Sequence, residues 1–309
     1  MVAILLQTLP FFALIGLGYW AGRSGFFSED ATAYLTKFVF YFALSAMLFQ
    51  FSANLSLAEV FDAEFVLAYF LGTVVIYLVG TAVAMARRIG TAETAIEAQC
   101  TVIGNVGFLG IPMFAMLFGP DSIGPMLLVL ATDLIFFGSL IVILVTGSRD
   151  GRMHFGILKT VGVGLLKNPM IMSIGAGLIW AGFDLPIPVP VNDFLEILGA
   201  AATPGALFAI GASLASKSAE RVSVALWLSG AKLFLHPAAV AISALVLFSV
   251  DPYAAGVMIA AAAMPVAGNV FILAQHYGIA PQRVSASILL STVGSVVTVT
   301  AVVAWVQGL

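Results

Sequence analysis

Two segments of the sequence place glycine, asparagine and proline in the middle of long apolar stretches. Proline removes a backbone donor and clashes with the preceding turn, and glycine lets the chain leave helical geometry. A helix broken in this way presents terminal amides that attract anions and terminal carbonyls that attract cations. We therefore predict a binding site for a small charged solute at the two breaks. Its candidate residues are Gly104, Asn105 and Pro112 in the first segment and Pro265, Gly268 and Asn269 in the second.

Lys232 and Asp133 also lie deep within apolar stretches, where charges are costly and usually functional. Counting about 1.5 Å per residue from Arg221 puts Lys232 roughly 16 Å into its helix, near the centre of a bilayer. His236 follows one helical turn later and shares the face of Lys232. These residues predict either an anion or proton site or a structural Lys232–Asp133 ion pair, and spacing alone leaves both open. Lys37 and Glu97 lie nearer the ends of their stretches, where both could snorkel to the interface, and we expect this of Lys37.

Enzyme signatures are missing from the sequence. It contains no Walker A sequence, no His-Glu-x-x-His and no Gly-x-Ser-x-Gly. Its three histidines and its single cysteine, Cys100, are too few to supply a metal site with ligands. We therefore expect no catalytic residue, no metal ion and no cofactor, while H+ or Na+ stays open as a coupling ion.

The composition requires a lipid environment. Of the 309 residues, 61% are hydrophobic and 9% are charged, and the mean hydropathy is +1.12. A soluble domain carries roughly 25% charged residues, because its surface faces water. The chain is therefore predicted to be an all-α integral membrane protein. Its net charge of −3 is too small to indicate a nucleic-acid partner.

The apolar stretches predict ten transmembrane helices of roughly 20 residues or more each. They cover residues 2–22, 31–51, 64–86, 91–118, 123–147, 165–183, 194–215, 221–250, 252–277 and 282–306. The predicted breaks fall in helices four and nine. We divide the chain into a first five-helix repeat (1–147), a cytoplasmic connection (148–164) and a second five-helix repeat (165–309).

The basic residues alternate with these helices and predict their orientation. Ten of the twelve lie in odd-numbered connections, and the even-numbered connections contain none. Because lysine and arginine accumulate on the cytoplasmic side, both termini are predicted to face the non-cytoplasmic side. We expect a multi-pass protein of the plasma (inner) membrane.

The two halves of the sequence repeat weakly. Trp20-Ala21-Gly22 matches Trp180-Ala181-Gly182, and Ala53-Asn54-Leu55 matches Ala212-Ser213-Leu214 at nearly the same offset. An odd number of helices per half inserts the second half upside down. This predicts the inverted repeat that is common in secondary transporters, although chance similarity between apolar helices is the alternative.

Several motifs together resemble the auxin efflux carrier family in its short prokaryotic form. They are Gly104-Asn105-Val106-Gly107-Phe108-Leu109-Gly110-Ile111-Pro112, Lys167-Asn168-Pro169, Met264-Pro265, Asn269-Val270-Phe271 and Ala274-Gln275-His276-Tyr277-Gly278. The resemblance implies organic-anion transport: auxin in plant members, and dicarboxylates such as malate or malonate in bacterial relatives. It also implies a scaffold of helices one, two, six and seven, a moving domain of the others, and broken helices that cross at the substrate site.

The sequence departs from this family at two positions. Ser45 stands where the family usually has proline, and we keep it as a candidate site residue. Gly104 stands where plant members have proline, so the local backbone is expected to differ.

Three functional hypotheses follow from the sequence. The first is an alternating-access secondary transporter for a small organic anion, such as malate, malonate or an auxin-like acid, whose partners are that anion and the lipid bilayer. The second is a sodium-coupled symporter that resembles the bile-acid family. The third is a non-transporting membrane sensor or scaffold, to which only Ser45 points. A homodimer is among the oligomeric states that the sequence leaves open.

Overall fold

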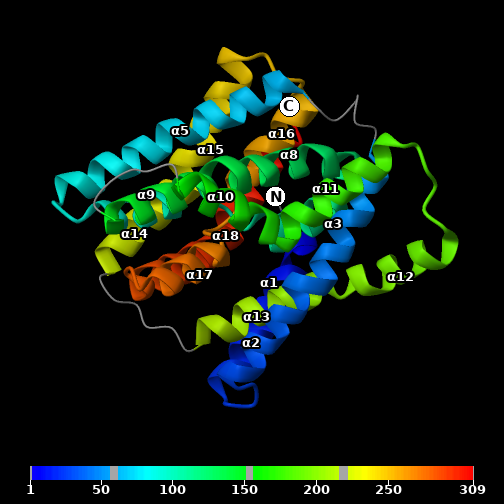
Figure 1. Cartoon of the computed structure of the whole chain (residues 1–309), viewed down its shortest axis with the longest axis horizontal. Coiled ribbons are helices and arrows are strands. Elements are labelled where there is room, and N and C mark those ends of the chain that lie inside the picture. The colour runs from blue at the N-terminus through cyan, green and yellow to red at the C-terminus, as the bar shows by residue number, and fades with distance from the viewer. Residues whose placement is uncertain (1, 56–61, 151–155, 216–221, 309) are drawn as a thin grey trace.

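The computed structural model describes residues 2–55, 62–150, 156–215 and 222–308. This part of the chain is helical apart from short connections (Figure 1). The α-helices are α1 (Val2–Arg23), α2 (Glu29–Phe38), α3 (Leu44–Ala53), α5 (Ala63–Ala86), α6 (Thr91–Val102), α7 (Ile111–Phe118), α8 (Ile123–Thr132), α9 (Gly138–Asp150), α10 (Gly156–Lys167), α11 (Pro169–Gly182), α12 (Val189–Ala200), α13 (Ala202–Ala215), α14 (Val222–Gly230), α15 (His236–Ile242), α16 (Pro252–Ala262), α17 (Gly268–Tyr277) and α18 (Pro281–Val306).

Among the described residues, seven helical stretches are long and apolar enough to cross a membrane, and an eighth arises if α10 and α11, which meet at a 70° bend, form one span. The seven are Ile4–Arg23, Glu29–Ala53, Ala63–Ala86, Pro120–Ser148, Val189–Ala215, Val222–Leu247 and Pro281–Val306. The prediction of an all-helical membrane protein is confirmed. Predicted helices four and nine are each split into two shorter helices, α6 with α7 and α16 with α17.

Three of the long helical stretches contain four π-helical turns between them, and each turn inserts one residue into the helical repeat. These turns are Val39–Ala43, Asp133–Phe137, Ala231–Leu235 and Ser243–Leu247. A fifth, Val106–Gly110, lies between α6 and α7. Such turns are frequent at functional sites, and three of them hold or adjoin predicted site residues: Asn105, Asp133 and Lys232.

The helices pack in two groups. In the first, α1 lies along α13, and α3 lies along α11 and α12. In the second, α5 packs against α6 and α15, and α18 packs against α14, α16 and α17. Figure 1 shows the first group at the lower right and α5, α9, α14 and α17 of the second group on the left. The groups meet where α1 contacts α18 and where α13 contacts the turn Val106–Gly110.

The contact between α1 and α13 depends on glycine. A Cβ atom added to Gly211 would lie 1.9 Å from the carbonyl oxygen of Ile15, and one added to Gly18 would lie 2.1 Å from that of Phe208. In a bilayer, helices associate through close van der Waals packing, because lipid tails are as apolar as the side chains. Glycine at these positions lets the two backbones touch directly.

A buried ion-pair cluster ties α6 to α18 and to the end of α5. Glu97 is 1% exposed and forms ion pairs with Arg87 and Arg283, while Arg283 also contacts Glu93 at 3.3 Å. Glu97 therefore does not snorkel to the surface, which the sequence left open. The cluster holds α6, the first half of broken helix four, against the last helix.

We predict that Gly211→Ala destabilises the protein by roughly 1–3 kcal/mol, because the new methyl group forces α1 and α13 apart. Gly16→Ala in α1 is the matched control, since a Cβ there would meet no atom within 4 Å. The midpoint of thermal unfolding in detergent measures both effects. Equal midpoints for the two variants would contradict the direct backbone contact.

Candidate functional site

The breaks in helices four and nine pair with each other. The amide of Asn105 donates to the carbonyl oxygen of Pro265 at 2.8 Å, and the amide of Ala267 donates to that of Ile103 at 3.0 Å. These bonds form one antiparallel bridge, in which Gly104 faces Val266. Each break therefore supplies partners for backbone groups that the other break has freed, as a low-dielectric environment demands.

Local features complete the hydrogen bonding around the bridge. The amide of Val266 donates to the hydroxyl of Ser291 on α18 at 3.0 Å. The carbonyl of Asn105 accepts from the amides of Leu109 and Gly110, which starts the π-helical turn. Pro112 is the second residue of α7, which continues the helix that the π-helical turn begins.

A small cavity of about 50 Å³ lies beside the bridge. It is lined by Phe40, Gly104, Asn105, Gly107, Phe108, Leu130, Leu134, Asn168, Met170, Ala267, Gly268 and Asn269. The structure thus brings together four of the predicted site residues, two from each break. The remaining predicted residues do not line it: Ser45, Pro112, Asp133, Lys232 and Pro265.

Two helix N-termini reach this cavity. Gly268 and Asn269 are the first residues of α17, and Gly107 lies in the first turn after the other break. The first amides of a helix have no intrahelical partner, and each N-terminus carries roughly half a positive charge. The side-chain oxygen of Asn269 is buried and has no hydrogen-bond partner in the described part of the chain. The amides of the two helix N-termini favour an anion in the cavity, whereas the oxygen of Asn269 is an acceptor and does not contribute to that preference.

Lys232 stands directly behind Gly104. Its side chain is fully buried, and its ammonium donates to the carbonyl oxygen of Ala262 and lies 3.1 Å from Nδ1 of His236. A Cβ atom on Gly104 would lie 3.2 Å from the ammonium nitrogen. Ala262 is the last residue of α16, so Lys232 neutralises the negative end of that half-helix. Its charge still acts on the cavity across Gly104.

A polar chain of hydrogen-bonded groups lies between Lys232 and Asp133, interrupted at Tyr69, whose backbone carbonyl and side-chain hydroxyl bond to different partners. Nε2 of His236 lies 3.1 Å from the hydroxyl of Thr73, which donates to the carbonyl of Tyr69 at 2.7 Å. The hydroxyl of Tyr69 donates to Oδ1 of Asp133 at 2.9 Å. Oδ2 of Asp133 is buried without a hydrogen-bond partner among the described residues. No direct ion pair joins Lys232 to Asp133, both of which belong to the described residues, so the two charges interact only at longer range.

Ser45 lies in the first turn of α3, just after the π-helical turn Val39–Ala43, and does not line the cavity. Its hydroxyl donates to the carbonyl of Phe40 at 3.2 Å. This turn contains Phe40, which lines the cavity. Ser45 therefore acts on the cavity wall through the backbone. Three further lining residues were not predicted from the sequence: Phe40, Met170 and Asn168. Asn168 nevertheless belongs to one of the family motifs.

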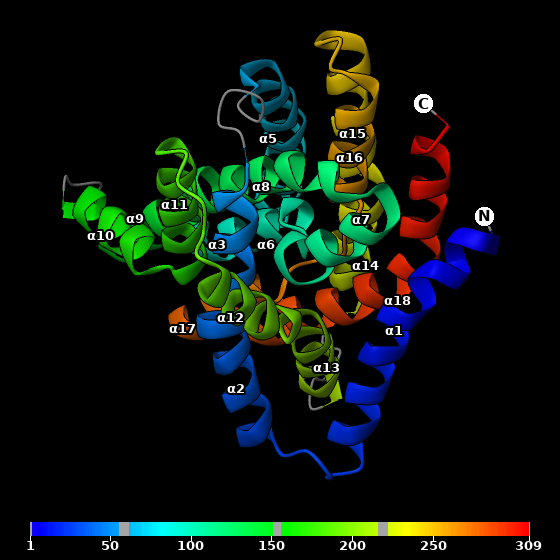
Figure 2. The ribbon, with the colours of Figure 1, turned by 90° about the vertical axis from the view of Figure 1, so that its right-hand side faces the viewer.

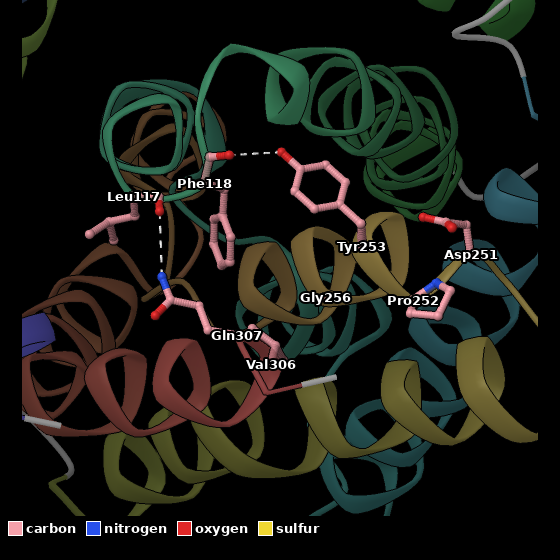
Figure 3. Close-up of a pocket in the computed structure, with 8 residues that line it drawn as sticks. All are labelled: Leu117, Phe118, Asp251, Pro252, Tyr253, Gly256, Val306 and Gln307. Carbon is pink, nitrogen blue, oxygen red and sulfur yellow. Dashed lines mark hydrogen bonds between the residues drawn. The ribbon is translucent and has the colours of Figure 1, made fainter.

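A larger hollow of about 530 Å³ lies elsewhere, among the ends of α7, α16 and α18 (Figure 3). There the hydroxyl of Tyr253 donates to the carbonyl of Phe118 at 3.0 Å, and the amide of Gln307 donates to that of Leu117 at 3.4 Å. The carboxylate of Asp251 also lines it. The carbonyls of Phe118 and Leu117 already have donors, and no predicted site residue lies at this hollow, so the smaller cavity is the candidate site.

Comparison with known proteins finds relatives over almost the whole chain. A family profile described as "Membrane transport protein" matches residues 3–303. The "Putative malonate transporter" of Rhizobium meliloti (strain 1021) is 29% identical over 298 residues, which cover 94% of this chain and 92% of the relative. The "Uncharacterized transporter" YfdV of Escherichia coli (strain K12) is 24% identical, covering 94% and 93%. The "Uncharacterized transporter" MJ1031 of Methanocaldococcus jannaschii is 22% identical, covering 93% of each.

We predict that Lys232→Met lowers the stability by about 1–3 kcal/mol, because it leaves the buried carbonyl of Ala262 and a nitrogen of His236 unpaired. Asp133→Asn keeps an acceptor for the hydroxyl of Tyr69, so it should lower the stability by less than Lys232→Met does. Because the two side chains do not touch, the effects should add in the double variant to within about 0.5 kcal/mol. Thermal unfolding of the three variants measures this. A double variant as stable as the wild type would instead establish a structural Lys232–Asp133 pair.

Proposed function

Because this chain belongs to the membrane transport protein family, the family of the auxin efflux carriers, we propose that it carries a small organic anion by alternating access. The observation that carries the proposal is the cavity at the paired breaks, where two helix N-termini meet the side chains of Asn105 and Asn269. The cavity also lies between the two packing groups, since Phe40 and Met170 come from the first group and Asn269 from the second. Movement of one group against the other would open it to either side.

The charges around the cavity support a carboxylate as substrate. Two helix N-termini supply about one positive charge together, and Lys232 adds a full charge behind Gly104. Amide N–H groups form charge-assisted hydrogen bonds with carboxylate oxygens, which are stronger than neutral ones. An anion entering this site recovers part of the free energy that it loses when it leaves water.

The size of the cavity favours a small aliphatic acid over an auxin-like one. A volume of about 50 Å³ holds about four water molecules when each needs roughly 10–15 Å³ of this kind of space. An indole ring does not fit such a space without a large rearrangement. The name of the Rhizobium meliloti relative points to malonate for that protein, and we infer a short carboxylate of this kind for the present chain.

The carbonyl end of α16 argues against sodium coupling. In transporters with broken helices, the C-terminal carbonyls of half-helices coordinate the sodium ion. Here the ammonium of Lys232 already donates to the carbonyl of Ala262. The lysine therefore occupies the position at this helix end that a sodium ion would take. Asp133, with one unpartnered oxygen at the far end of the polar chain, is the better-placed group to accept a coupling proton.

The proposed carrier has ten spans in two inverted repeats, with both termini on the non-cytoplasmic side of the plasma (inner) membrane. Seven long helices, the bent pair α10–α11 and the two broken helices supply ten segments. The two termini lie near each other (Figure 2), and the hydroxyls of Thr8 on α1 and Thr300 on α18 are 3.4 Å apart. Termini on the same side agree with an even number of spans.

We predict that the purified protein in proteoliposomes takes up labelled malonate without a sodium gradient, and faster with a proton gradient. Asn269→Leu should lower uptake at least about tenfold, because it removes the amide from the site, while insertion is retained since leucine suits a membrane. Gln307→Leu, which removes an amide outside the cavity, is the matched control and should transport normally. Uptake that requires sodium would support the symporter hypothesis. A folded protein that transports no carboxylate would support the sensor or scaffold.

We predict that Asp121→Cys reacts with an impermeant thiol reagent added to intact cells, whereas Ser24→Cys reacts only after the membrane is opened. Both positions are exposed, and they belong to connections on opposite sides of the proposed topology. The native Cys100 is buried, so background labelling should be low. Labelling of Ser24→Cys in intact cells would reverse the orientation.

A further inference from the structure

Asn168 is the polar contribution of the first packing group to the cavity. Of the described lining residues, Phe40, Asn168 and Met170 come from this side, and the other two are apolar. The two sides are in close contact here, because a Cβ atom on Gly107 would lie 2.7 Å from the methyl group of Met170. Asn168 therefore faces the donors of the paired breaks from the opposite wall.

The hydrogen bonding of Asn168 determines which of its groups is available. It is the N-cap of α11, and its side-chain oxygen accepts from the amide of Met170 at 3.0 Å. A backbone N–H donates only to an acceptor, so this bond assigns the oxygen atom and leaves the NH2 group as the remaining donor. The same bond fixes the orientation of the side chain at the 70° bend between α10 and α11.

We propose that the NH2 group of Asn168 binds the second carboxylate of a dicarboxylate whose first carboxylate lies at the paired breaks. This assignment rests on the proposed function and adds a specificity to it. The other side chains of this wall, Phe40 and Met170, are apolar, and so are the lining residues Leu130 and Leu134. A second carboxylate that faced these side chains alone would lose its hydration without compensation. A monocarboxylate with one anionic end does not need Asn168, so this residue selects dicarboxylates over monocarboxylates.

The test compares the binding of malonate and acetate to purified wild-type protein and variants by calorimetry. Asn168→Asp keeps an oxygen that can accept from the amide of Met170, but it replaces the donor with a negative charge. Asn168→Ser keeps a shorter cap and a hydroxyl donor. The control is Asn192→Asp, because the side-chain oxygen of Asn192 accepts from Gln50 at 3.0 Å, outside the cavity.

We expect Asn168→Asp to bind malonate at least about tenfold more weakly than the wild type, with a much smaller loss for acetate, so that the preference for malonate collapses. The malonate affinity of Asn168→Ser should lie between those of the wild type and Asn168→Asp, and Asn192→Asp should bind malonate as tightly as the wild type. An unchanged malonate-to-acetate ratio in Asn168→Asp and Asn168→Ser would overturn the role of Asn168 and leave the proposed function standing. Equal losses for both ligands would show a structural role and also overturn it. Failure of the wild type to bind any carboxylate would overturn the proposed function and this inference together.

Discussion

The structure depends on one constraint: a backbone that breaks inside a membrane must find hydrogen-bond partners within the protein. The two breaks meet this demand by pairing with each other, through Asn105 with Pro265 and Ala267 with Ile103. Neither break could persist at this depth without the other. The pairing also brings the start of α17 and the turn Val106–Gly110 to one cavity. The requirement for backbone satisfaction therefore creates the site as well as stabilising the fold.

The carbonyl ends and the amide ends of the half-helices differ in their hydrogen bonding at the breaks. This difference determines which sign of charge the site prefers. The carbonyl end of α16 is already satisfied, because Lys232 donates to Ala262. The amide ends of the other half-helices face the cavity. A carbonyl end that is already satisfied and amide ends that face the cavity favour an anion over a cation. Lys232 contributes in both ways, since it occupies the carbonyl end and places positive charge behind Gly104.

The positions of the helices and of the two breaks could be predicted from the sequence, because both have local signatures. Apolar length marks a helix, and glycine, asparagine and proline within it mark a break, whereas the crossing that brings Asn105 and Asn269 together was implied by the family resemblance. The partner of Lys232 could not be predicted, because the carbonyl of Ala262 carries no signature in the sequence. The burial of Glu97 was not predicted either, since its partner Arg283 lies far along the chain. The position of Asn168 at the cavity could not be predicted, because an asparagine before proline is typical of a helix cap. Asn168 is indeed the N-cap of α11.

The central claim is that the paired breaks form the anion site, and a crystal structure with bromomalonate tests it most directly. Bromine scatters anomalously, so its position can be located independently of the protein atoms. The account predicts one peak in the cavity between Asn105 and Asn269, with a carboxylate at the start of α17. A peak in the hollow among α7, α16 and α18, or no peak at saturating ligand, would contradict it.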